Sequence, residues 1–172
     1  MHNKGFFNLT KISYTKVNAL EQDIFVPGEG SFSYDLKTED ATSYAIQTIN
    51  GYFFNPYISL GLGLGIEGFN SPNINTLPIF ADVRVYLQDD YSTPFAFLDI
   101  GGMIKASDNF NQGNMFALGA GYKFFVGEEK KISLVTDVSF SGRNISLTDE
   151  AVRTSENKLA IRGVALSFGI IF

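Results

Sequence analysis

The feature of the sequence that most restricts the fold is an alternation of large apolar and small residues from Tyr57 to Phe69, which reads YISLGLGLGIEGF. The even-numbered positions from 58 to 66 carry Ile or Leu, whereas the odd-numbered ones carry mainly Ser and Gly. Successive side chains of a β-strand point to opposite faces, whereas a helix would scatter this pattern around its circumference. The stretch is therefore predicted to be a strand with one apolar face and one face of small residues.

A second interpretation of the same stretch is a nucleotide site, because Gly63 to Gly68 matches the GxGxxG pattern. That fingerprint requires a helix immediately after the glycines, where the helix N-terminus holds the pyrophosphate. The chain continues instead as Phe69-Asn70-Ser71-Pro72-Asn73, a loop sequence that contains a proline. The glycines are therefore interpreted as small strand residues, and no cofactor is expected.

Period-two alternation recurs along the whole chain and predicts an all-β fold of eight strands, each of about ten residues. The predicted strands are 5–17, 43–54, 57–69, 76–87, 95–105, 114–126, 132–141 and 158–172. The faces of the first two strands are mixed. The polar stretch Leu147 to Asn157 could hold one turn of helix, and no other helix is indicated.

The connections between these strands differ in length in a regular way. Residues 55–56, 88–93 and 127–131 form short turns, whereas 18–42, 70–75, 106–113 and 142–157 are longer. Alternate connections of an up-and-down meander fall at the same end, so one end is predicted to carry short turns and the other the longer loops. A meander of eight strands can close into a barrel.

Composition limits the classes of function. The chain of 172 residues is predicted to be a single domain over 1–172. It has no cysteine, and its one histidine, His2, is at the extreme N-terminus, so neither a metal site nor a His-based enzyme is expected. A net charge of −5 argues against nucleic-acid binding. No apolar run is long enough for a transmembrane helix, and no signal peptide is evident, so an exported protein would be present here in its mature form.

The small-residue face indicates which side of the barrel points outward. In the last strand this face carries no charge: it reads Ile161, Gly163, Ala165, Ser167, Gly169, Ile171. A surface exposed to water would carry charged residues, whereas a narrow lumen requires small ones. The apolar face of the opening strand spans roughly 26 Å, close to the apolar band of a membrane barrel. A transmembrane barrel is therefore predicted; a soluble, lipocalin-like barrel with an apolar ligand inside is the alternative.

Aromatic residues provide a second indication, because many fall at strand ends beside the short turns. Membrane barrels place aromatic girdles at the lipid interface. The predicted girdle comprises Tyr52, Phe53, Phe54, Tyr57, Tyr86, Tyr91, Phe95, Tyr122, Phe124, Phe125, Phe168 and Phe172.

With these features the chain resembles the small eight-stranded outer-membrane barrels of Gram-negative bacteria, the OmpA/OmpX-like group. Its composition, rich in Asn and Phe, resembles that of the members of this group from Bacteroidetes. Its last strand, VALSFGIIF, is similar to the signal that the barrel-assembly machinery reads; the positions that carry the pattern are Val164, Leu166, Phe168, Ile170 and Phe172. The resemblance implies residence in the outer membrane, with 18–42 and 142–157 outside the cell. Arg162, a charge at a lipid-facing position near the outer rim, would meet lipopolysaccharide phosphates or extend its charged end to the interface. No peptidoglycan-binding domain follows Phe172, so that function is not carried over.

Charged residues at lumen-facing positions form the first candidate site, which comprises Asp82, Arg84, Asp99, Lys123 and Asp137. A charge in a narrow lumen must be paired, because burying an isolated ion is costly. An interior salt-bridge network that fills the barrel is therefore predicted. The alternative is a selectivity ring in a narrow pore or transporter.

The second candidate site is the long loop 18–42, which holds Phe25, Phe32 and Tyr34 among acidic residues. Loops vary freely on a rigid scaffold and often carry function. The expected role is therefore non-enzymatic: a structural or surface-interaction protein that binds a protein partner through its loops, or a small subunit of an outer-membrane complex.

Overall fold

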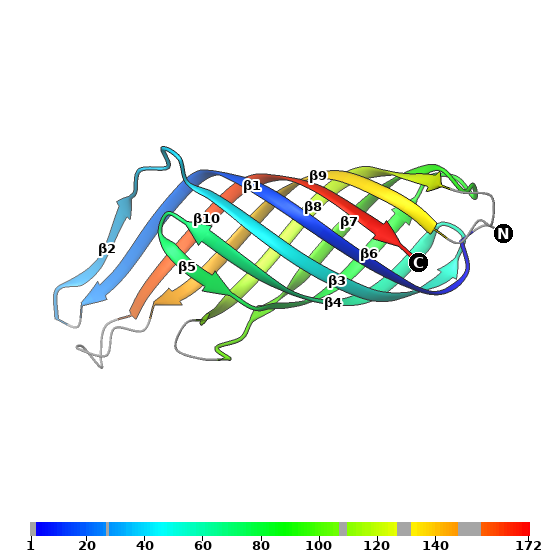
Figure 1. The fold of residues 1–172 in the computed structure, drawn as a ribbon. Helices are drawn as coiled ribbons and strands as arrows, with labels where there is room; N and C mark the ends of the chain where they lie inside the picture. Colours follow the sequence, from blue (N-terminus) through cyan, green and yellow to red (C-terminus); the bar gives the residue numbers. More distant parts are fainter. Residues whose placement is uncertain (1–2, 27, 107–109, 127–131, 148–155) are drawn as a thin grey trace.

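A computed structural model describes residues 3–26, 28–106, 110–126, 132–147 and 156–172, and every regular element in these ranges is a β-strand (Figure 1). The strands are β1 (Gly5–Val26), β2 (Gly30–Asp35), β3 (Thr42–Asn55), β4 (Ile58–Asn70), β5 (Asn73–Thr76), β6 (Pro78–Tyr86), β7 (Thr93–Met103), β8 (Phe110–Val126), β9 (Ile132–Leu147) and β10 (Glu156–Ile171). None of the described residues belongs to a helix long and apolar enough to cross a membrane.

Eight of these strands form a closed antiparallel ring in the order β1, β3, β4, β6, β7, β8, β9, β10. Pairing of β10 with β1, from Leu9 opposite Ile171 to Phe25 opposite Glu156, closes the ring. The predicted eight-stranded antiparallel up-and-down transmembrane β-barrel is thereby confirmed, and each predicted strand corresponds to one strand of the ring. The start of β1 and the end of β10 lie at one end of the barrel, the turn end, whereas β2 and β5 lie at the other, the loop end (Figure 1).

The prediction of a long loop at 18–42 is wrong, because most of these residues belong to β-strands. β1 continues to Val26 past a bulge at Asn18, and β2 pairs back onto it from Glu21 opposite Asp35 to Val26 opposite Gly30. The result is a β1–β2 hairpin that extends the barrel wall at the loop end (Figure 1). A bulge inserts one residue without a partner and shifts the alternation by one position. The lumen-facing positions of β1 therefore change from odd to even numbers after Asn18.

Two other predicted loops are also shorter than expected. The stretch 70–75 forms a hairpin in which β5 pairs with β4. β5 also pairs with β8 in parallel. This second pairing is possible because β6 begins only at Pro78 and β7 ends at Met103, so neither strand separates β5 from β8 at the loop end. β9 continues to Leu147, beyond the predicted end at Ser141. The predicted turn at 127–131 and most of the helical turn at 147–157 lie outside the described residues.

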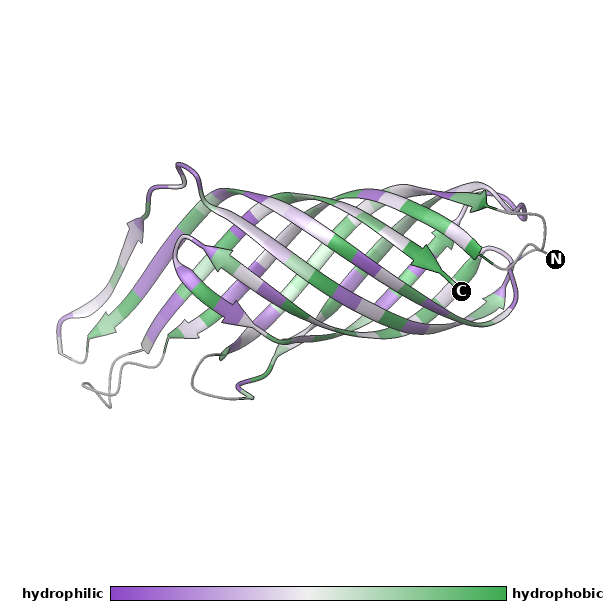
Figure 2. Cartoon of the chain, viewed as in Figure 1, coloured by the Kyte–Doolittle hydropathy of each residue, from purple (hydrophilic) through white to green (hydrophobic). Residues whose placement is uncertain are grey.

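Hydrophobic and hydrophilic residues alternate along the strands (Figure 2), and their burial places the large apolar residues on the outer face as predicted. In β4 the Ile and Leu side chains at even positions are exposed on the outer face, with Leu62 at 71% exposure, whereas Gly63, Gly65 and Glu67 are buried. The mixed faces of β1 have two causes. One is the bulge at Asn18, and the other is a group of polar side chains on the outer face.

The lumen is filled by two apolar layers. The layer at the turn end contains Phe7, Leu9, Ile49, Phe53, Phe80, Tyr86, Phe95, Phe97, Met115, Ala117, Val135 and Ile171. The layer at the loop end contains Val17, Leu20, Ala41, Phe69, Ile74, Met103, Ile145, Leu159 and Ile161. The girdle prediction is wrong for Phe53, Tyr86 and Phe95, which point into the lumen. Tyr52, Phe54, Tyr57, Tyr122, Phe124, Phe168 and Phe172 are exposed, whereas Tyr91 and Phe125 are half-buried.

The glycines of β4 leave room for large side chains from neighbouring strands. A Cβ atom on Gly63 would overlap the ring of Phe80, which is only 2% exposed. Replacing glycine by alanine in a strand interior normally stabilises a protein by roughly 0.5–1 kcal/mol. We expect Gly63→Ala to reverse that sign and lower the free energy of unfolding by about 1–3 kcal/mol through overpacking.

Denaturant titration of the refolded barrel measures this change. The matched control is Gly102→Ala, where an added Cβ would meet the Gly113 carbonyl oxygen at 3.5 Å, an ordinary contact. Equal effects of the two substitutions would contradict the close fit between Gly63 and Phe80.

Candidate functional site: the lumen charges and the loop-end hairpin

The innermost ion pair joins two residues of β6. Arg84 and Asp82 have the same parity, so both side chains enter the lumen. The Arg84 Nε atom donates to both Asp82 carboxylate oxygens at 3.0 Å, and Nη2 lies 2.9 Å from Oδ2. Both side chains are fully buried, and the guanidinium lies about 5 Å from the ring centres of Phe95 and Phe97. This pair is a desolvated ion pair enclosed by aromatic rings.

The other three predicted lumen charges are buried but make different contacts. Asp99 lies 3.6 Å from the Nζ atom of Lys11, a residue of β1. Lys123 donates a hydrogen bond to the Asn3 side chain and lies over the Tyr86 ring. Asp137 is 2% exposed, and among the described residues neither of its carboxylate oxygens receives a hydrogen bond. The predicted residues therefore share one lumen, but they do not form one continuous network.

A second buried ion pair lies nearer the loop end. Arg143 of β9 donates from Nε to Glu67 of β4 at 2.9 Å, and Ser43 donates to the same carboxylate at 3.0 Å. Sequence reasoning did not include Glu67, Arg143 or Lys11 in the site. The signal was present for Glu67, which has lumen parity in the opening strand. Arg143 was missed because the predicted strand ended too early, and Lys11 because the faces of the first strand were mixed.

The buried charges balance one another. Among the described residues, the buried acids are Glu67, Asp82, Asp99 and Asp137, and the buried bases are Lys11, Arg84, Lys123 and Arg143. Between the two ion-paired regions lies a polar cavity of ≈ 20 Å³, lined by serine, threonine and Gln47 side chains as well as charges. Such a volume holds about one water molecule. Charged, polar and apolar layers together fill the lumen.

The described residues offer no group of three or more His, Cys, Asp or Glu side chains that could hold a metal ion. The charges of the lumen instead have the arrangement of structural ion pairs, with each cation near an acid, an amide or an aromatic ring.

The aromatic residues of the second candidate site lie on the β1–β2 hairpin, on opposite faces of it. Phe32 is paired with Ile24 and Tyr34 with Gln22, so these two aromatic side chains share the face that continues the lumen side of the wall. Phe25 has the opposite parity and points to the outer side. All three are exposed, by 40–52%. Among the described strands β2 pairs with β1 alone, so its other edge is open.

The C-terminal strand presents the predicted alternation to the outside. Val164, Leu166, Phe168, Ile170 and Phe172 are all exposed, whereas the residues between them face the lumen. Arg162 lies on the same outer face near the loop end, where its Nη1 atom is 3.4 Å from Glu21. About half of each of these two side chains is exposed, so this pair adds little stability.

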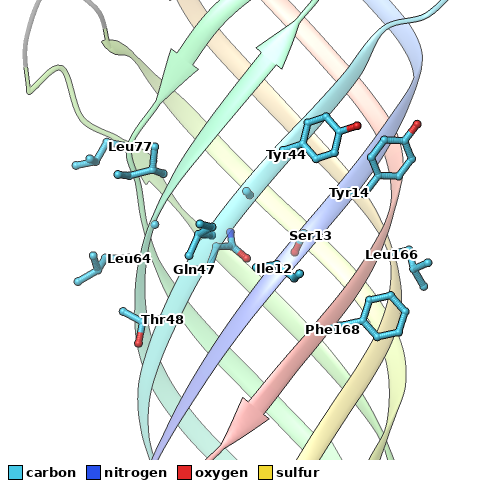
Figure 3. Close-up of a pocket in the computed structure, with 14 residues that line it drawn as sticks. Ile12, Ser13, Tyr14, Tyr44, Gln47, Thr48, Leu64, Leu77, Leu166 and Phe168 are labelled. Atoms are coloured by element: carbon cyan, nitrogen blue, oxygen red, sulfur yellow. The ribbon is translucent and has the colours of Figure 1, made fainter.

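A groove runs along the outer face where β10, β1, β3 and β4 lie side by side (Figure 3). Its volume is ≈ 840 Å³, and its outward side chains are mainly apolar, such as Ile12, Ile46 and Leu64. Tyr14 and Tyr44 stand together along it, with ring centres 5.3 Å apart (Figure 3). A smaller groove of ≈ 400 Å³ lies nearer the turn end, lined by Phe6, Tyr52 and Leu62 among others.

A closed antiparallel ring with an apolar exterior defines the class of the transmembrane β-barrels, and an interior filled by side chains is typical of those with eight strands. Two solved structures have the same plan over nearly their whole length. The outer membrane protein OprG from Pseudomonas aeruginosa aligns with a TM-score of 0.59 and 11% identity, over 99% of this chain and 96% of that one. Neisserial surface protein A aligns with a TM-score of 0.56 and 16% identity, over 97% and 96%. No protein-family model matches the sequence, and no curated protein matches it either. The likeness is one of fold.

Proposed function

We propose that the chain is an integral protein of a bacterial outer membrane that performs no enzymatic step and presents its loop-end hairpin to a protein partner. The observation that carries this proposal is the filled lumen, because it leaves no open interior site among the described residues, whereas the extended β1–β2 hairpin is exposed and available for contact. Within that class we assign the chain to the OmpA/OmpX-like small barrels, of the Bacteroidetes type. It could act alone or as a small subunit of an outer-membrane complex.

The hairpin has the features of a contact surface. An open strand edge offers a row of backbone N–H and C=O groups to which another chain can add a strand. Exposed Phe32 and Tyr34 lie beside that edge, and aromatic residues are enriched where proteins bind one another. Lipopolysaccharide phosphates at the outer rim are a partner for Arg162, and the exposed pattern of β10 fits recognition by the barrel-assembly machinery.

Orientation in the membrane can be tested with single cysteines, because the natural sequence has none. We expect Ser31→Cys in β2 to react with a membrane-impermeant maleimide on intact cells. Tyr57→Cys at the turn end should react only after the outer membrane is permeabilised. The reverse pattern, or no labelling of Ser31→Cys on intact cells, would contradict an external hairpin.

The narrow-pore alternative makes a different electrical prediction. Because apolar layers close the lumen at both ends, we expect the purified protein in planar bilayers to give no current above that of the empty bilayer. Stepwise, reproducible conductance that is absent from mock-purified samples would favour the pore.

A further inference from the structure

Four polar side chains face the lipid on two adjacent strands: Asn8 and Thr10 of β1, and Thr48 and Asn50 of β3. We call them the polar ladder. Asn8 Nδ2 donates to Thr48 Oγ1 and to Asn50 Oδ1, both at 3.0 Å, and Thr10 donates to Asn8 Oδ1 at 3.1 Å. The two threonine hydroxyls are 3.3 Å apart. The polar ladder is therefore a hydrogen-bonded unit on the outer wall.

The polar ladder lies within the apolar band and not at its edge. Phe6 and Tyr52 pack together towards the turn end, with ring centres 4.9 Å apart, and Tyr14 and Tyr44 pair towards the loop end. Along both strands the threonine is midway between its two aromatic residues. On the neighbouring strand, Thr48 and Asn50 are paired with Leu64 and Leu62 of the apolar face. Such aromatic pairs mark the two interfaces of a membrane barrel, so the threonines lie near the middle of the hydrocarbon.

The polar ladder does not satisfy all of its own hydrogen-bonding groups. Asn50 Oδ1 accepts from Asn8, but among the described residues no atom accepts a hydrogen bond from the Asn50 amide nitrogen. Acyl chains offer no acceptor, and a polar group left unpaired in hydrocarbon is unfavourable. The outward amide of Asn50 therefore needs a protein group opposite it.

We propose that this face is the interface between two copies of the chain related by a two-fold axis that passes near Asn50. A primary amide is both donor and acceptor, and its oxygen has two lone pairs, so two Asn50 side chains can donate to each other while Asn8 keeps its bond. In a two-fold interface the same patch meets itself, as this self-complementary group requires. The grooves on either side touch the polar ladder at Thr48 and Asn50 and can receive apolar side chains of the second copy.

Cysteine cross-linking tests the axis directly. We expect Asn50→Cys to form a disulfide-linked dimer of about twice 19.0 kDa when membranes are oxidised. The matched control is Leu118→Cys on β8, which is also exposed to lipid but lies across the ring from β3; it should stay monomeric. Dimers from both variants or from neither, or a product of Asn50→Cys with another protein, would overturn the proposal.

A second measurement does not depend on cysteine chemistry. We expect the wild-type protein to associate in lipid vesicles, as seen by two-step photobleaching of labelled molecules. The variant Asn8→Leu/Thr10→Val/Thr48→Val/Asn50→Leu should be a folded barrel, with its dimer weakened on the order of tenfold or more. Migration of unheated samples on gels checks folding. A wild-type monomer, or a folded variant that dimerises as strongly as the wild type, would refute the two-fold interface.

Discussion

Asp82→Ala is expected to be the most destabilising single substitution in the lumen. It removes the carboxylate that Arg84 contacts through Nε and Nη2, and the guanidinium is fully buried. Removing one partner of a buried pair leaves an uncompensated charge, which typically costs about 3–5 kcal/mol. The free energy of unfolding should fall by this amount in urea titrations of vesicle-bound protein. Circular dichroism is the suitable signal, because the chain has no tryptophan.

The double variant Asp82→Ala/Arg84→Met separates the lost ion pair from lost packing. Replacing both charges by apolar groups of similar volume is often neutral, because neither ion then needs compensation. We therefore expect the double variant to recover most of the stability that Asp82→Ala loses. If the double variant were as unstable as the single one, the guanidinium would not be the source of the loss.

Leu118→Arg is expected to have the next largest effect, and it tests the orientation of the wall. Leu118 is 58% exposed on the outer face of β8, between Leu98 and Phe140 of the adjacent strands. In lipid, an arginine at the midplane of a barrel wall costs about 2–4 kcal/mol. In a soluble barrel of the same shape, the arginine would be at the water-exposed surface and cost little stability. The difference distinguishes the membrane barrel from the lipocalin-like alternative.

Gln112→Arg is the matched control, since Gln112 has the same outward parity on β8 but lies at the loop end. Near the interface an arginine costs only about 0–1 kcal/mol. Unfolding in vesicles measures both variants. Equal and small effects at the two positions would contradict a hydrocarbon environment at Leu118.

The wall of the barrel could be predicted from the sequence because each ring strand repeats with period two, and that period also separates lipid from lumen. Two features escaped the pattern for identifiable reasons. The bulge at Asn18 changes the parity of β1, so residues after it appeared to belong to a loop. An aromatic residue near a rim can point either to the lipid or into the lumen. Phe53 and Tyr86 were assigned to the girdle from their place near the rim, although both point into the lumen.

The lumen site was predicted in part, because parity shows which side chains enter the lumen but not which ones meet. Asp82 and Arg84 share a strand, so their pairing follows from local geometry. The partners Glu67 and Arg143 belong to β4 and β9, and only the closed ring brings them together. The β1–β2 hairpin was equally inaccessible, because the strand β2 has only six residues and nearly all of them are exposed.

Closure of the ring by β10 on β1 has a consequence for how the barrel is built. Asn8 and Phe172 exchange backbone hydrogen bonds in both directions, so the last rung of the wall joins residues from opposite ends of the sequence. Without β10, the strands β1 and β9 would each expose a row of unpaired N–H and C=O groups to hydrocarbon, where nothing can satisfy them. A partly built barrel is therefore a poor intermediate, and insertion and closure should be cooperative, with the slow step set by contacts of very high sequence separation.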